Sequence, residues 1–513
     1  MSLEEEKMSA HRMSRRLTLL AILGALVLPQ AALAQTGPPE VLDPELAVRT
    51  AASGLSQPTG MAFIGENDIL VNQKANGQVR RVLNGVLLPD PVLDLHVNSN
   101  SERGLLGMAL DRRFRVNGWV YLYWTESSIG ADTGVNGNVP LLGNRVDRFV
   151  WDGSKLTFDQ NVIMLRAAQP AVPATPGPAQ GAAGNHDGGV LRVGPDDGKL
   201  YIFIGDTGRR GWNQNLRCGP TTVYNCPPGT PVADDIFGGP MPDNAHFTGV
   251  VIRVNPDGTA PRWNPFYDYG AEVGGEAGAN IQKIYAYGFR NGYGMAFDPR
   301  GHRLWEAANG DDTFSELEVV EAGMNSGWIQ FMGPASRVSQ FKTIETTPGP
   351  TSDPFAPNGY VGLQQNRWPP SNLADTTAEA MSRLQMYPGA HYSDPELSWV
   401  YEVGPAAIGF LEGKGLGNEY ASDLFMGGSR NFLEGGHLFR FELTPNRKGI
   451  DVSGDPRLAD LVADNTGKWN IVESESLLFG RNFGIVTEIV TGPNGNLFLL
   501  SNQAGAIYEI YRP

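Results

Sequence analysis

Short apolar segments alternate with turns rich in Asp, Gly, Pro or Asn along most of the chain, and long amphipathic helical runs are scarce. This pattern is typical of β-strands joined by tight turns. One unit recurs, in which a short apolar strand leads through such a turn into a second apolar strand. Its six copies cover residues 58–73, 103–126, 188–206, 292–311, 406–429 and 487–503. The pattern therefore predicts an all-β protein built from repeated hairpins.

The turns explain the units chemically. At 194–198 and 492–495, Pro presets one backbone dihedral and Gly accepts the positive φ that a hairpin turn needs. Further strand candidates, such as 144–153 and 436–443, could complete four-stranded sheets. Radial repetition protects the edges of such sheets, so we predict a six-bladed β-propeller. Uneven spacing between the copies predicts long inserted loops, and these are expected at 166–184, 207–248 and 330–392.

The N-terminal segment predicts export. Two arginines precede a short apolar run that ends in an A-x-A pattern at 32–34, which is typical of a cleaved signal peptide covering 1–34. The alternative is an uncleaved anchor, but the apolar run is too short for a membrane span. We expect residues 35–513 to form a single propeller domain that is periplasmic or secreted. The net charge of −15 does not favour nucleic-acid binding.

The two cysteines, Cys218 and Cys226, lie close together in a Gly/Pro-rich segment. In an oxidising compartment such a pair is expected to form a disulfide. A pair of zinc ligands is the competing interpretation, although no nearby His or Cys completes a set of four.

His186 is the first candidate for catalysis. It stands between Asn185 and Asp187, before two glycines that allow close approach of another molecule. Asp206 ends the strand that follows the next turn, so a hairpin could return it to His186. A carboxylate beside an imidazole fixes its tautomer and stabilises its charged form, as a general base requires. A structural loop histidine is the alternative.

Three further positions could contribute charge or metal ligands. Arg290 precedes a Gly-rich strand and could stabilise a developing oxyanion, or it could be a surface cation. Glu102 and Arg103 could act in the site or form a salt-bridged loop. The stretch 308–312 offers carbonyl and carboxylate oxygens that suit Ca²⁺, with a solvated turn as the alternative.

Several segments together resemble the soluble quinoprotein glucose and aldose sugar dehydrogenase family. They are collinear over roughly residues 55–511 and include 101–125, 185–206, 251–266, 284–299, 323–328 and 490–510. The resemblance implies a six-bladed propeller that holds pyrroloquinoline quinone (PQQ) with Ca²⁺. It also implies oxidation of the C1 hydroxyl of aldoses to lactones, with an external electron acceptor.

Residue by residue, the resemblance implies a catalytic base at His186, its carboxylate partner at Asp206 and a stabilising cation at Arg290. Cofactor contacts are implied at Asn291 and at Glu102, where family members often have Gln. The carbonyl pair that binds the Ca²⁺ would fall on Gly310 and Asp311, where the family has Gly-Pro.

The expected cofactor cations differ from the family pattern. Arg430 stands where the family has Lys, which keeps the charge. Ile485 and Thr487 stand where the family has two arginines. Because PQQ carries three carboxylates, a substitute cation is expected, and Arg481 is the nearest in sequence.

Two other functions remain open. Six-bladed propellers also host Ca²⁺-dependent lactonases, for which Glu102, Asn185, Asn291 and Asp311 are the candidate ligands. A secreted, non-enzymatic binding protein that has lost PQQ is favoured by Ile485 and Thr487.

Overall fold

The computed structural model describes residues 37–167, 184–208, 215–217, 228–230, 243–310, 312–346 and 373–513. All of them belong to one compact unit, Gln35–Pro513. The predicted signal peptide, the predicted disulfide between Cys218 and Cys226, and the predicted metal ligand Asp311 lie outside the described residues. In the described part of the chain, no helix is long and apolar enough to cross a membrane.

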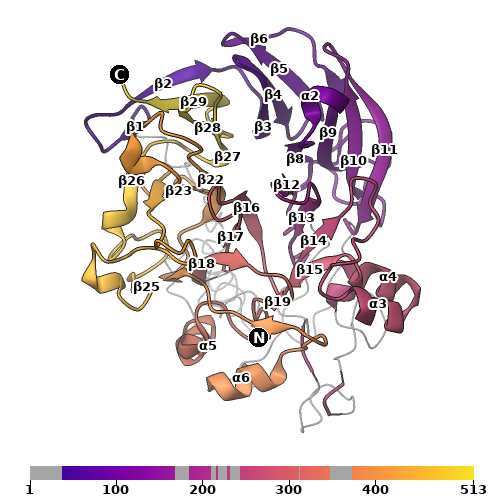
Figure 1. Cartoon of the computed structure of the whole chain (residues 1–513), viewed down its shortest axis with the longest axis vertical. Helices are drawn as coiled ribbons and strands as arrows, with labels where there is room; N and C mark the ends of the chain where they lie inside the picture. The colour runs from indigo at the N-terminus through magenta and orange to yellow at the C-terminus, as the bar shows by residue number, and fades with distance from the viewer. Residues whose placement is uncertain are drawn as a thin grey trace, which may run out of the picture. The chain divides into compact units, whose positions relative to one another are not determined.

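The described strands form six sheets, each with its own innermost strand (Figure 1). The innermost strands are β3 (Pro58–Gly65), β8 (Leu105–Leu110), β12 (Leu191–Val193), β16 (Gly292–Phe297), β22 (Pro405–Phe410) and β27 (Val486–Thr491). The second strands are β4 (Asp68–Gln73), β9 (Trp119–Thr125), β13 (Leu200–Ile204), β17 (Leu304–Ala308), β23 (Leu424–Gly428) and β28 (Leu497–Ser501).

The third strands are β5 (Gln78–Leu83), β10 (Asn144–Trp151), β14 (Val250–Val254), β18 (Thr313–Val320), β24 (Leu438–Phe441) and β29 (Ala506–Tyr511). Outer strands complete the sheets: β1 (Glu40–Val41), β2 (Ala47–Ala52), β6 (Val86–Leu87), β7 (Leu93–Asp94), β11 (Leu156–Leu165), β15 (Ile284–Tyr287), β19 (Met324–Asn325), β20 (His391–Tyr392), β21 (Leu397–Tyr401), β25 (Val462–Ala463) and β26 (Leu478–Arg481).

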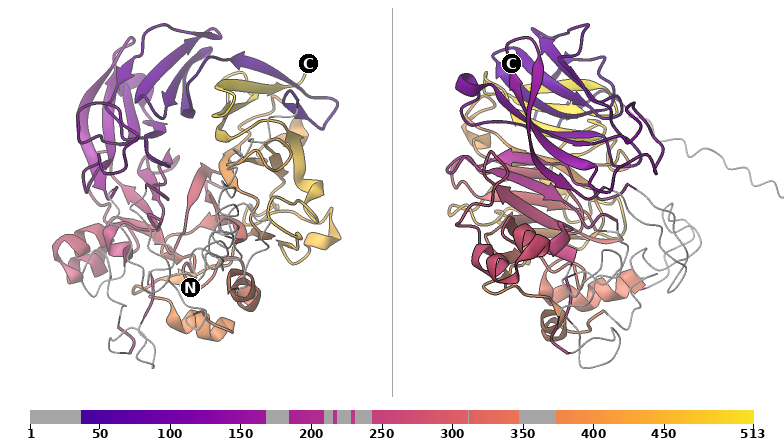
Figure 2. Two further views of the ribbon diagram at one scale, coloured as in Figure 1. Left: turned by 180° about the vertical axis from the view of Figure 1, so that it is seen from behind. Right: turned by 90° about the vertical axis from the view of Figure 1, so that its right-hand side faces the viewer.

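The sheets are arranged in a closed ring (Figure 2). The innermost strands contact one another in the cyclic order β3, β8, β12, β16, β22, β27 and back to β3. Near the N-terminus of the described unit, β2 pairs antiparallel with β29, so the two ends of this unit share one sheet. This closure joins segments that are more than 450 residues apart in sequence. The prediction of an all-β propeller is confirmed.

Each of the six sequence copies is the hairpin formed by the two inner strands of one sheet. The pairs are antiparallel in every case, from β3 with β4 to β27 with β28. The local signal of strand, turn and strand therefore located the inner half of every sheet. The third strands depend on pairings over longer distances, and only the candidates at 144–153 and 436–443 were identified for them.

The apolar core lies between neighbouring sheets. In one cluster, Met61 and Val71 from the sheet of β3 pack with Phe498 and Leu500 from the sheet of β28. Each fully buried side chain of this size contributes on the order of 1.5–3 kcal/mol. Packing of each sheet on two neighbours therefore holds the ring together.

Helices occur between the strands: α2 (Phe114–Asn117), α3 (Tyr267–Val273), α4 (Gly275–Ile281), α5 (Val338–Thr346) and α6 (Thr377–Arg383). The prediction of a long loop at 330–392 is wrong in part, because α5 and α6 lie within this stretch. The α6 helix begins where the Thr376 side chain accepts the N–H of Glu379, a capping contact that the sequence analysis did not identify.

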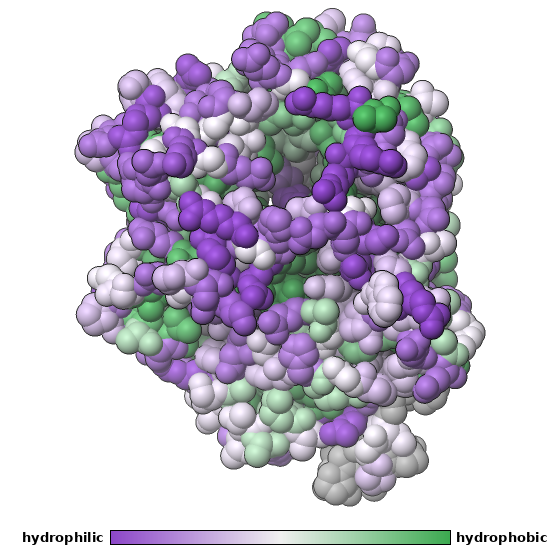
Figure 3. All heavy atoms as spheres, in the orientation of Figure 1, coloured by the Kyte–Doolittle hydropathy of each residue, from purple (hydrophilic) through white to green (hydrophobic). Residues whose placement is uncertain are grey.

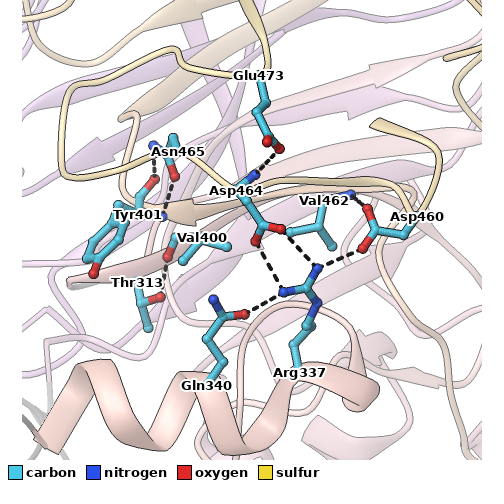
Figure 4. Close-up of polar contacts among 10 residues, drawn as sticks. All are labelled: Thr313, Arg337, Gln340, Val400, Tyr401, Asp460, Val462, Asp464, Asn465 and Glu473. Carbon is cyan, nitrogen blue, oxygen red and sulfur yellow. Dashed lines mark hydrogen bonds and ion pairs between the residues drawn. The ribbon is translucent and has the colours of Figure 1, made fainter. Parts of the chain in front are cut away.

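Arg337, just before α5, attaches this insertion to the segment around β25 (Figure 4). Its guanidinium donates to Asp460 at 2.7 Å and to Asp464 at 3.1 Å, and also to the Gln340 side chain at 2.9 Å. Both carboxylates are about half exposed. The contact is therefore a screened ion pair at the surface, supported by the apolar packing beneath α5.

Candidate active site

Five of the predicted site residues lie at one end of the ring of sheets. His186, Glu102 and Arg290 lie just before innermost strands, whereas Asp206 and Arg430 lie just after second strands. The two strands of each hairpin are antiparallel. The start of the first strand and the end of the second therefore lie side by side, at the same end of the sheet. The hairpin repeat thus brings residues from distant sequence positions to one face.

His186 contacts Asp206 directly. The Nδ1 atom of His186 lies 2.5 Å from Oδ1 of Asp206, and both side chains are buried. The His186 backbone has a φ of 55°, and its N–H donates to Oε2 of Glu102 at 2.6 Å. A left-handed backbone is uncommon for a residue with a side chain, so this contact with Glu102 helps to hold the imidazole in position.

Asp206 accepts hydrogen bonds at both of its carboxylate oxygens. Gly208 donates its N–H to Oδ1 at 2.8 Å, and Trp328 donates its indole N–H to Oδ2 at 2.9 Å. Burial raises the pKa of Asp206, but the charges and hydrogen bonds of its neighbours, led by His186 and Arg290, lower it below the ordinary value. The ionised Asp206 carboxylate accepts a hydrogen bond from the N–H at Nδ1 of His186. The other ring nitrogen, Nε2, is then unprotonated and can act as the base.

Arg290 lies beside this pair. Its backbone carbonyl accepts the N–H of Asp206 at 2.8 Å, and its guanidinium lies 5.7 Å from the ring centre of Trp328. Nη1 donates to the carbonyl oxygens of Asn309 at 2.8 Å and Gly310 at 2.7 Å. The Arg290 cation is therefore buried and held in one orientation.

The same contacts bear on the predicted calcium ligands. The Gly310 carbonyl faces the Arg290 guanidinium, which would repel a second cation, and Ca²⁺ takes six to eight oxygen ligands. In the described part of the chain, no group of three His, Cys, Asp or Glu side chains could hold a metal ion. The Gly310 carbonyl is therefore already an acceptor for Arg290, and a Ca²⁺ site formed by Gly310 and Asp311 stays a prediction.

A cavity of about 250 Å³ opens at the centre of the ring. Every innermost strand contributes its second residue to the lining, and these residues are Thr59, Leu106, Arg192, Tyr293, Ala406 and Thr487. Figure 3 shows the molecule hollowed near its middle, with hydrophilic residues around the opening. The cavity lies at the edge that carries His186, since Gly188 and Gly189 line it too.

Three cations and two carboxylates line this cavity. The cations are Lys74, Arg192 and Arg430, and the carboxylates are Glu102 and Glu488. Lys74 donates to the carbonyl oxygens of Ser99 at 3.1 Å and Ser101 at 2.8 Å, and burial lowers its pKa. The lining therefore carries an excess of positive charge when all five groups are ionised.

Sequence reasoning missed Lys74, Arg192, Glu488 and Trp328. A signal existed for Arg192, because it is a charged residue within the apolar strand β12. No local signal marks Trp328 as the donor to Asp206, since 122 residues separate them.

Two predicted cofactor residues have other contacts. Arg481, on β26, pairs with Glu40 of β1 and is not among the residues that line the cavity. The Asn291 amide donates to the Tyr293 hydroxyl at 3.0 Å. Asn185, a candidate ligand in the lactonase hypothesis, accepts from the Ser101 hydroxyl at 2.7 Å. The structure thus brings Arg430 to the cavity and does not bring Arg481 there.

Residues 55–355 match the family described as glucose/sorbosone dehydrogenase. The chain belongs to this family. It is 26% identical over 284 residues to quinoprotein glucose dehydrogenase B of Acinetobacter calcoaceticus, covering 55% of this chain and 52% of that protein. It is 27% identical over 277 residues to aldose sugar dehydrogenase YliI of Escherichia coli, covering 53% and 59%. The matches thus span little more than half of these relatives' length.

Solved structures of similar proteins share the fold. The apo form of the soluble aldose sugar dehydrogenase from Escherichia coli aligns with 91% of this chain and 100% of its own, at a TM-score of 0.58 and 17% identity. The PQQ-bound form of an aldose sugar dehydrogenase from Streptomyces coelicolor aligns with 92% and 98%, at a TM-score of 0.51 and 20% identity.

The described cavity fits an anionic quinone of the PQQ type by its chemistry. Lys74, Arg192 and Arg430 offer donors to carboxylates, and the lining also contains apolar side chains such as Leu106 and Ile485. A mostly apolar pocket with a few placed charges is typical of cofactor sites.

Proposed function

We propose that this chain is an exported PQQ-dependent dehydrogenase that oxidises the C1 hydroxyl of aldoses to lactones and passes electrons to an external acceptor. In this proposal each of the six sheets is one blade of the propeller. The carrying observation is the contact between His186 and Asp206 beside a central cavity lined by cations. Membership of the glucose/sorbosone dehydrogenase family supports the same reaction class.

His186 acts as the general base in the proposed reaction. Its Nδ1 proton is held by the ionised Asp206, so Nε2 accepts the proton of the sugar hydroxyl. The imidazolium that forms is stabilised by the Asp206 carboxylate, whose position depends on Gly208 and Trp328. Arg290 places a fixed positive charge near this pair and stabilises negative charge on the substrate oxygen.

The cofactor site follows from the residues that line the cavity. PQQ, when bound, supplies a two-electron acceptor. Arg430 and Lys74 would hold its carboxylates from the loops after β23 and β4. The Glu102 carboxyl group accepts the His186 N–H and offers no cation to a cofactor carboxylate, so we assign it to positioning the base.

The test is a titration of the purified protein with PQQ, with and without Ca²⁺, followed by tryptophan fluorescence. A dye-reduction assay across several aldoses then measures turnover. We expect saturable binding and sugar-dependent dye reduction. Binding without sugar oxidation would contradict the dehydrogenase, and hydrolysis of a lactone without any quinone would support the lactonase instead. Absence of both activities and of binding would support a non-enzymatic protein.

A further inference from the structure

An ion pair crosses the centre of the ring. Nη2 of Arg192 on β12 donates to Oε1 of Glu488 on β27 at 2.6 Å. In the cyclic order of the six innermost strands, β12 and β27 are three positions apart, which places them opposite each other. The Arg192–Glu488 pair therefore spans the channel within the cavity lining, and 296 residues separate its partners.

Arg192 is the charged member of a described ring of otherwise uncharged side chains. The second residues of the other innermost strands are Thr59, Leu106, Tyr293, Ala406 and Thr487. One of these, Thr487, stands where the resemblance leads us to expect an arginine. This chain therefore carries a cation, Arg192, at the same level of the channel as Thr487. The cation lies on β12, opposite the strand β27 on which the resemblance leads us to expect it.

The Arg192 guanidinium has donors left for a ligand. It uses one donor for Glu488 and one, on Nη1, for the carbonyl oxygen of Leu191 at 2.8 Å. A guanidinium has five N–H donors, so three have no partner among the described residues. Its side chain is 21% exposed, and it is exposed to the cavity that it lines. Glu488 is nearly fully buried and holds the guanidinium from the far side.

We infer that Arg192 receives a carboxylate of the quinone cofactor in a two-bond contact, with Glu488 fixing the guanidinium from across the channel. This inference rests on the proposed function and assigns a binding residue within its site. Arg192 takes the place of the charge that Ile485 and Thr487 do not supply. A planar guanidinium matches a carboxylate with two parallel hydrogen bonds, which a lysine ammonium cannot reproduce.

The experiment compares two probes by equilibrium dialysis: PQQ, with three carboxylates, and its uncharged trimethyl ester. We expect Arg192→Met to weaken binding of PQQ by roughly 10- to 100-fold, the range for a lost hydrogen-bonded charge contact. Binding of the ester should change by less than about twofold, because an ester presents no carboxylate charge. Arg192→Lys keeps a positive charge but not the planar guanidinium. In this variant the ratio of PQQ affinity to ester affinity should be at least about threefold lower than in the wild type.

Arg440→Met is the matched control. Arg440 pairs with Asp423 at 2.7 Å, its side chain is also 21% exposed, and it does not line the central cavity. We expect it to bind both probes as the wild type does. Circular dichroism and thermal unfolding show whether each variant is folded, and Arg192→Lys carries the test if Arg192→Met does not fold.

The outcomes separate this inference from the proposed function. If the wild type binds PQQ and the Arg192 variants prefer PQQ over the ester as strongly as the wild type does, the role of Arg192 is overturned. The proposed dehydrogenase function is then unaffected. Equal weakening of PQQ and ester would also overturn it, because Arg192 would then shape the cavity without contacting a carboxylate. Wild type that binds neither probe would overturn both proposals.

Discussion

Asp206 and Glu306 are both fully buried carboxyl groups in the same ring of sheets, yet their pKa values move in opposite directions. The Asp206 pKa is lowered, because His186, Arg290 and three hydrogen bonds outweigh burial. The Glu306 pKa is raised well above its ordinary value by burial and by the carboxylates of Glu318 and Glu316. Burial alone thus does not decide ionisation, and the charge of the neighbours does.

The three glutamates share one face of their sheet. Glu306 on β17 lies directly opposite Glu318 on β18, and Glu316 is two residues from Glu318 on the same strand. Successive residues of a strand alternate between faces, so all three carboxyl groups point the same way. Ser326 donates to Glu318 at 3.0 Å, and Gly333 donates its N–H to Glu316. The region around Asp206 therefore favours an ionised carboxylate beside His186. The region around Glu306 favours neutral carboxyl groups in the core.

The largest expected effect follows from Asp206→Asn. The amide cannot stabilise an imidazolium and can donate to Nδ1, which favours the wrong tautomer of His186. We expect kcat for sugar oxidation to fall by about 10³- to 10⁴-fold, with PQQ affinity nearly unchanged. Steady-state dye reduction and a PQQ titration measure the two quantities.

Asp196→Asn is the control for that variant, because Asp196 contacts His302 at 2.7 Å in a more exposed His–Asp pair away from the cavity. It should keep full activity. His186→Gln should abolish turnover and spare folding. An Asp206→Asn variant with activity close to that of the wild type would show that the contact is structural only.

The second effect concerns stability and pH. The pKa of Glu318 is raised to about 7 from 4.5, mainly by burial, so between these values the native state binds more protons than the unfolded state. This group therefore makes its full contribution to the free energy of unfolding below pH 4.5, and the contribution is lost as the pH rises through about 7. Glu306→Gln removes a buried carboxyl group whose raised pKa makes the native state hold a proton that the unfolded state releases as the pH rises. We expect it to raise the free energy of unfolding at pH 8 by roughly 1–3 kcal/mol, and by less at pH 5.

Urea unfolding at the two pH values measures this difference, with Glu442→Gln as the control. Glu442 is an exposed glutamate and should change stability little at either pH. If Glu306→Gln lowered stability at pH 8, its carboxylate would have to be ionised and stabilising in the native state, as that of Asp206 is.

The smallest effect is expected at the surface. Arg337→Met breaks the pairs with Asp460 and Asp464, which are exposed and screened by salt. We expect the free energy of unfolding to fall by less than about 1 kcal/mol, with a smaller loss at high salt. Thermal unfolding at 0.05 and at about 1 M salt is the measurement. A loss of several kcal/mol would mean that these pairs hold the α5 insertion in place.

Part of the site was predictable because it depends on local order in the hairpins. His186 precedes an innermost strand and Asp206 follows the second strand of the same hairpin, so one turn is enough to bring them to one edge. Arg290 was singled out because it precedes a Gly-rich strand, and Arg430 was assigned by the resemblance alone. Arg481 was chosen by distance along the chain, and it lies instead on an outer strand beside Glu40.

The sequence by itself determined the inner hairpins, the all-β class and the residues at the starts of innermost strands. These features follow from two-residue periodicity and turn chemistry, which act within about twenty residues. Only the tertiary structure decided which side chains meet across the ring, such as Arg192 with Glu488 or Trp328 with Asp206. Those contacts depend on how many sheets separate two strands and on closure of β2 against β29, and neither property is encoded in any single hairpin.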